Sequence, residues 1–267
     1  MATYTPITTT SHNTLWWRYS QDYSYATTDI ICTLTAREMQ KALLTDVIGF
    51  VAGHSGIVPV MLQGIEKGIN LKVNANGVWT GRYIPQVYWH YPFKALKTDE
   101  GQYIVCADHD SGLINADSSG FGFFNGEGQP TDEYTKLTEQ LAEFEAQKFQ
   151  TGTIMEILTR YELFEPWLFD YEVEEKHYQI SDLFQINEKT LKALSGDEMI
   201  ELRDSGALLV AHCQLLSMQN VAGLLTTLYK QKAAAQIEDT QSESPVKGAD
   251  KDYNLFDESG TISFDNL

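Results

Sequence analysis

The stretch VIGFVAGHSGIVPVMLQ, residues 47–63, contains two apolar runs separated by a short turn. Residues 47–52 and 57–63 are rich in β-branched side chains, and Gly53-His54-Ser55-Gly56 between them begins and ends with glycine. Two such runs joined by a glycine-containing turn are typical of a β-hairpin. We therefore expect antiparallel strands at the start of the core.

Further strands are expected on the C-terminal side of this hairpin. Residues 71–73 predict a strand that leads into Asn74-Ala75-Asn76-Gly77, a turn whose Asn-Gly pair tolerates positive φ. Residues 93–96 and 103–107 predict another hairpin. Residues 120–130 contain four glycines and are expected to form a loop.

The second half of the chain has helical periodicity. From about residue 131, apolar side chains recur at spacings of three and four, which predicts an amphipathic helix. The pattern weakens at 150–152, so we expect a kink or break there. Residues 168–173 and 178–184 predict a small hairpin, followed by helices at 187–194, 196–204 and 205–232.

The last of these helices is apolar on more than one face, which is expected of a central buried helix. His212 within it is expected to be a buried histidine that bonds to a neighbour. Gln214 and Ser217 either line a pocket or bond to buried backbone groups. The sequence leaves these two alternatives open.

These elements predict an α+β fold: an N-terminal antiparallel β-sheet region, a mainly helical half with a small hairpin, and an acidic tail. We place the β-rich region at 1–125, the helical region that shares its core at 126–232, and a disordered tail at 233–267. Within the tail a few apolar side chains could bind a protein partner: Tyr253, Leu255, Phe256, Ile262 and Phe264.

Composition narrows the possible partners. The net charge is −18, from 19 basic and 37 acidic residues, so nucleic acids are unexpected partners. We expect no integral membrane segment, because we find no run of about 20 apolar residues. Three widely spaced cysteines are expected to be reduced and buried, and the absence of a signal-like N-terminus favours the cytoplasm, with export without a cleaved signal as the alternative.

Aromatic side chains crowd residues 79–93, where they surround an arginine. Aromatics combine large apolar area with polar tips, and arginine can clamp an anion, so this cluster predicts a site for a peptide or small organic ligand. A structural corner is the alternative reading. The residues assigned to the predicted site are Trp79, Arg82, Tyr83, Tyr91 and Trp167.

No motif specifies a reaction, a cofactor or a catalytic residue. Asp108-His109-Asp110 could supply metal ligands, completed by His90, His177 or His212, but the spacing matches no metal motif and a solvated loop is favoured. Nucleophile-elbow and phosphate-loop patterns are absent from the sequence. A metal-dependent tailoring enzyme therefore remains a secondary hypothesis.

A series of ordered motifs between Asn13 and Leu228 resembles the bacterial SapC family. The motifs are Gly77-Val78-Trp79, Arg82-Tyr83-Ile84-Pro85, Tyr91-Pro92-Phe93, Phe124-Asn125-Gly126-Glu127-Gly128-Gln129-Pro130-Thr131, Leu163-Phe164-Glu165-Pro166-Trp167 and Leu183-Phe184-Gln185-Ile186-Asn187-Glu188. The resemblance implies accessory work on a small molecule or peptide, and we expect a non-catalytic binding or accessory protein. The family's association with bacterial surface layers makes a surface-layer or export-associated structural protein the alternative.

Overall fold

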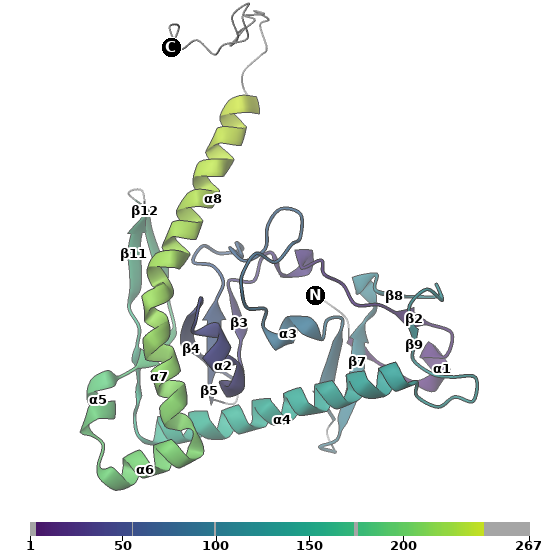
Figure 1. Cartoon of the computed structure of the whole chain (residues 1–267), viewed down its shortest axis with the longest axis horizontal. Coiled ribbons are helices and arrows are strands. Elements are labelled where there is room, and N and C mark those ends of the chain that lie inside the picture. Colours follow the sequence, from purple (N-terminus) through teal and green to yellow (C-terminus); the bar gives the residue numbers. More distant parts are fainter. Residues whose placement is uncertain (1–3, 55, 99, 174–175, 243–267) are drawn as a thin grey trace, which may run out of the picture. The chain divides into compact units, whose positions relative to one another are not determined.

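The predicted hairpin forms the middle of a five-stranded antiparallel sheet, here called the central sheet (Figure 1). A computed structural model describes residues 4–54, 56–98, 100–173 and 176–242. The order of the strands is β10 (Phe164–Pro166), β13 (Leu183–Ile186), β4 (Val47–Gly53), β5 (Gly56–Leu62) and β3 (Ile31–Thr33). Gly53 pairs with Gly56, whose φ of 126° accounts for the glycine at the turn.

Side chains of β4 alternate between two apolar layers, as the period of a strand requires. Ile48 and Phe50 point into the layer formed with the helices α2 (Ala36–Ala42) and α7 (Ala207–Ser217). Val47 belongs to the layer on the other face, which is closed by a small hairpin and the start of α8 (Val221–Ser242). The α+β class is thereby confirmed.

That small hairpin is the one predicted around residue 175, but it is shorter than expected. It pairs β11 (Phe169–Val173) with β12 (Lys176–Ile180). The expected strand at 178–184 divides at Asp182, where φ is 61°. Beyond that residue the chain leaves the hairpin and enters the central sheet as β13.

Two smaller sheets lie toward the other end of the long helix α4 (Asp132–Arg160) (Figure 1). The first contains β1 (Tyr4–Pro6), β7 (Tyr103–Asp108) and β6 (Phe93–Lys97), which confirms the second predicted hairpin. The other contains β8 (Ile114–Asn115), β2 (Trp16–Trp17) and β9 (Phe121–Gly122). The strand expected at 71–73 is reduced to one bridge, from Val73 to Trp79, while the predicted turn is present with Gly77 at φ 73°.

Helix α4 runs without a break, so of the kink or break expected at residues 150–152 the break is wrong. Thr131 caps its start by accepting a hydrogen bond from the Tyr134 amide at 3.2 Å. Where the sequence pattern weakens, the Thr151 hydroxyl donates to the Gln147 carbonyl and accepts from the Ala36 amide, both at 2.7–2.8 Å. Contact with α2 therefore stabilises α4 at the point where its apolar periodicity weakens.

The expected C-terminal helix at 205–232 is two helices, α7 and α8, joined by the 3-10 turn η3 (Met218–Asn220). Before them come α5 (Glu188–Ala193) and α6 (Gly196–Ser205). Gln214 and Ser217 of α7 bond to buried backbone, because the Gln214 side-chain oxygen accepts from Ile186 N and the Ser217 hydroxyl accepts from Ile48 N, each at 3.0 Å. His212 is exposed, contrary to expectation, and its Nδ1 lies 2.8 Å from the Leu208 carbonyl.

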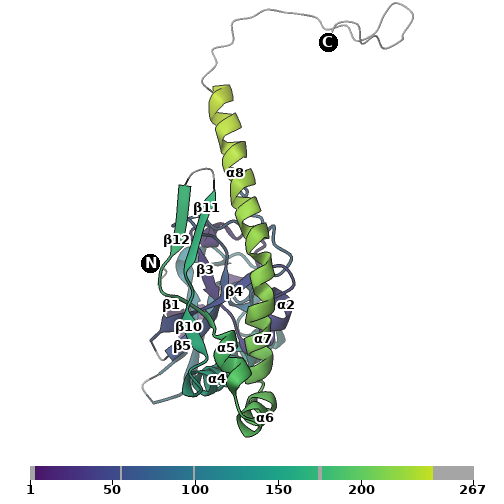
Figure 2. The same cartoon turned by 90° about the vertical axis from the view of Figure 1, so that its left-hand side faces the viewer.

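By length and composition alone, residues 207–234 could cross a membrane. In the structure, however, one side of α7 is buried against β4 and β13. The chain divides into one compact unit that ends at Tyr229 and a second that starts at Lys230 (Figure 2). Helix α8 continues to Ser242, past the boundary expected at residue 232. The five apolar residues predicted to bind a partner, from Tyr253 to Phe264, lie outside the described residues.

Candidate ligand-binding site

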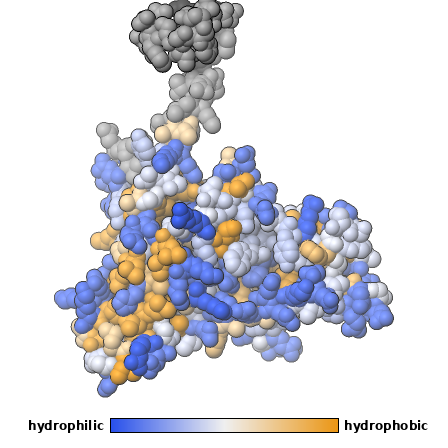
Figure 3. Space-filling view, in the orientation of Figure 1, coloured by the Kyte–Doolittle hydropathy of each residue, from blue (hydrophilic) through white to orange (hydrophobic). Residues whose placement is uncertain are grey.

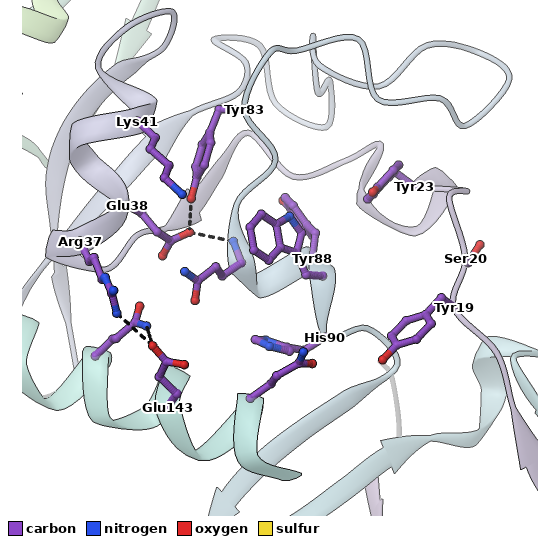
Figure 4. A pocket seen from close by; sticks show the side chains of 14 residues that line it. Tyr19, Ser20, Tyr23, Arg37, Glu38, Lys41, Tyr83, Tyr88, His90 and Glu143 are labelled. Atoms are coloured by element: carbon purple, nitrogen blue, oxygen red, sulfur yellow. Dashed lines mark hydrogen bonds and ion pairs between the residues drawn. The ribbon is translucent and has the colours of Figure 1, made fainter. Parts of the chain in front are cut away.

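A cavity of about 590 Å³ opens between α2, α4 and the segment that contains the short helix α3 (Gln86–Trp89). We call it the tyrosine pocket. Figure 4 shows Lys41, Glu38 and Tyr83 on one side and Tyr19 and Tyr23 on the other. The full lining is Tyr19, Ser20, Tyr23, Arg37, Glu38, Lys41, Tyr83, Gln86, Tyr88, Trp89, His90, Gln140, Glu143 and Gln147.

Glu38 of α2 connects two walls of the tyrosine pocket through hydrogen bonds. One carboxylate oxygen accepts from the amide and hydroxyl of Thr35, at 2.8 and 2.9 Å, which closes a capping box at the start of α2. The other accepts from the Tyr83 hydroxyl at 2.8 Å and the Gln86 amide at 2.7 Å. The buried carboxylate thus has four donors, which fits a structural role.

Tyr83 and Tyr88 are held rigidly in the walls. The Tyr88 hydroxyl lies 2.9 Å from Gln63 Oε1 and 3.1 Å from Asp29 Oδ2. Burial, together with nearby acidic groups, raises the pKa of both phenols well above the usual range, and burial also raises the pKa of Asp29. Both rings therefore present neutral, fixed aromatic surface to the pocket.

Two cations lie on the α2 side of the pocket, and only one is paired. Arg37 forms an ion pair with Glu143 at 2.9 Å, and Gln147 donates to the same carboxylate oxygen at 3.2 Å. Within the described part of the chain, the Lys41 ammonium has no hydrogen-bond or ion-pair partner. Lys41 is thus the positive charge in this wall that can still pair with an incoming anion.

His90 lines the pocket next to α4. The residue is 8% exposed, its ring packs 5.2 Å from the ring of Phe144, and it also borders a second cavity of about 230 Å³. Burial lowers its pKa, so the imidazole is neutral at neutral pH. Its Nδ1 has no partner among the described residues.

The structure separates the five residues predicted to bind a ligand. Tyr83 lines the tyrosine pocket, and Trp79 lies directly behind this wall, with its indole nitrogen donating to the Tyr83 carbonyl at 3.0 Å and its ring 5.4 Å from Tyr88. Arg82 is exposed and does not line the cavity. A ligand-binding role for Trp79 or Arg82 stays a prediction.

Tyr91 and Trp167 lie elsewhere. Tyr91 stacks on Tyr25 at 3.8 Å between ring centroids, and its hydroxyl lies 3.2 Å from Asp108. Trp167 is buried in the layer under the β11–β12 hairpin, against Phe169. Neither residue lines the tyrosine pocket.

The acidic and histidine residues weighed as metal ligands are also dispersed. Asp108 accepts from Tyr91 and from the Asp110 amide, while His109 Nε2 lies 3.0 Å from Nε2 of His12. Across the described ranges, no group of three or more His, Cys, Asp or Glu side chains is placed to hold a metal ion. His12 was not recognised in the sequence, because nothing local links it to a residue 97 positions away.

Comparison with known families agrees with the motifs. The profile of the SapC family matches residues 7–224. The chain belongs to the SapC family. No curated protein and no solved structure matches it. All residues that line the tyrosine pocket lie within the part of the chain that matches the SapC profile.

Proposed function

We propose that this SapC-family chain is a non-catalytic binding protein for a small organic anion with a planar apolar part, held in the tyrosine pocket. The observation that carries the proposal is the Lys41 ammonium, which lines the same cavity as four tyrosines and has no ion-pair or hydrogen-bond partner among the described residues. An anion would pair with Lys41, while the ring faces would cover a planar group. The volume of about 590 Å³ is within the range of cavities that hold small ligands.

The polar groups of the pocket support binding rather than chemistry. The carboxylates of Glu38 and Glu143 and the hydroxyls of Tyr83 and Tyr88 already bond within the protein. Groups held in this way shape a site and orient a ligand. The side-chain amides of Gln86 and Gln140 form no hydrogen bond within the described ranges, so they can adapt to a ligand's polar atoms.

Calorimetric titration with indole-3-acetate tests this proposal. Gln140→Trp fills the pocket from an exposed position on α4 and is expected to abolish binding. Thr135→Trp, also exposed on α4 but outside the lining, is the matched control and should bind like the unmodified chain. Equal affinity in both variants, or no binding of any aromatic acid by the unmodified chain, would reject the proposal.

A further inference from the structure

The outward face of α7 and of the first turns of α8 carries no charge. No Asp, Glu, Lys or Arg occurs in residues 205–229, although 21% of the chain consists of these types and about five would be expected in such a length. Leu209 and Leu216, seven residues apart on this face, are 49% and 56% exposed. Figure 3 shows hydrophobic surface along α7.

A groove extends this face toward α4. Its volume is about 440 Å³, and Leu209 and Val210 of α7 line it together with Phe149 and Ile154 of α4. Phe149 is 78% exposed, which is unusual for a phenylalanine ring. The single charged residue in the lining, Arg37, is already paired with Glu143. We call Phe149, Leu209, Leu216 and this groove the α7 face.

We infer that the α7 face is the interface of a homodimer. Two copies that each carry a net charge of −18 repel one another over most orientations. The α7 face, whose exposed α7 side chains are uncharged, lets them meet with few opposing carboxylates, and two-fold symmetry places the same patch on both sides. Each exposed Phe149 then has a groove on the partner to fill, lined by both apolar and polar side chains.

Two other occupants fit this face less well. An anionic membrane surface repels so acidic a protein, and α7 cannot enter a bilayer while Cys213, Gln214 and Ser217 are packed against the sheet. A second copy is favoured over a different protein because the exposed Phe149 ring and the groove that receives it in a two-fold dimer lie on the same surface.

Sedimentation equilibrium of the full chain at about 1–100 µM tests this inference. We expect a dimer of the 30.1-kDa chain, and Leu209→Glu/Leu216→Glu should raise the dissociation constant about 100-fold or more, because two buried apolar contacts become like charges. Raising the salt concentration should tighten the unmodified dimer by screening its net charge. Phe149→Asp is the second variant, in case the double substitution affects folding.

Leu96→Glu on β6 is the matched control, because Leu96 is 41% exposed and lies outside the α7 face. It should leave the dimer intact. A chain that is monomeric over the whole range would overturn the inference, as would a dimer that Phe149→Asp and the double variant leave unchanged. Vesicle binding that is lost in the α7 variants, without a dimer, would assign the face to a membrane instead.

Discussion

The Tyr83 hydroxyl donates to Glu38 Oε1 at 2.8 Å, joining two segments that are 45 residues apart in the chain. Through this bond the start of α2 and the aromatic segment after residue 79 become one wall. Lys41, one turn further along α2, lines the same pocket as Tyr83 (Figure 4). The site combines residues of two distant segments, and this explains why the aromatic segment alone did not define it.

Glu38→Ala is expected to destabilise the protein by about 3 kcal/mol or more, because it removes the acceptor of the buried Thr35 and Tyr83 donors and of the half-buried Gln86 amide. Urea unfolding measures this loss. Glu198→Ala is the control, since Glu198 closes a similar but exposed capping box with Ser195 and should cost only about 1 kcal/mol. Equal losses in the two variants would show that the Glu38 contacts contribute nothing beyond capping.

Lys72→Met is expected to cost about 3–5 kcal/mol, because it leaves the buried Asp46 carboxylate with the Thr45 hydroxyl but without its cationic partner. Changing both residues, as Lys72→Met/Asp46→Leu, should cost less than the single substitution, since no charge is then left buried. Thermal unfolding of the two variants makes the comparison. A double variant less stable than Lys72→Met would contradict this interpretation.

Acidification is expected to destabilise the fold through His12. Burial, and next the charge of nearby His109, lower the pKa of His12 below its usual range. Between these two pKa values the unfolded chain binds more protons than the folded chain. The contribution of neutral His12 to the free energy of unfolding is therefore complete above about pH 6.5, and it is lost as the pH falls toward the lowered pKa of the folded state.

Unfolding free energies at about pH 7.5 and about pH 5.5 test this prediction. The difference between the two should be smaller in His12→Gln than in the unmodified chain. The pKa of His90 is also lowered by burial, so His90→Gln should act in the same direction. The same pH dependence in His12→Gln and in the unmodified chain would disprove the assignment to His12.

Local patterns in the sequence predicted much of the fold. The hairpin of β4 and β5 and the hairpin of β6 and β7 were each predicted from short β-rich runs joined by a turn of suitable composition. The start of α4 shows its capping residue Thr131. The continuity of α4 at Thr151 could not be predicted, because a contact with α2 rather than helical periodicity maintains it.

The candidate site was predicted only in part. Tyr83 was selected from its aromatic surroundings, but Glu38 and Lys41 come from another part of the chain and were missed. The pattern Thr35-x-x-Glu38 does predict the start of a helix, and this signal was available in the sequence. It gives no indication that the same carboxylate also binds Tyr83, since that contact depends on how distant segments pack.

The central claim is that Lys41 binds an anion in the tyrosine pocket, and calorimetry with indole-3-acetate and its neutral amide tests it most directly. The acid should bind more tightly than the amide, and Lys41→Ala should weaken the acid about 10- to 100-fold while leaving the amide unchanged. Lys67→Ala, which removes an exposed charge outside the pocket and outside the predicted ligand-binding residues, should change neither affinity. Loss of acid binding in Lys67→Ala with full affinity in Lys41→Ala would contradict the account.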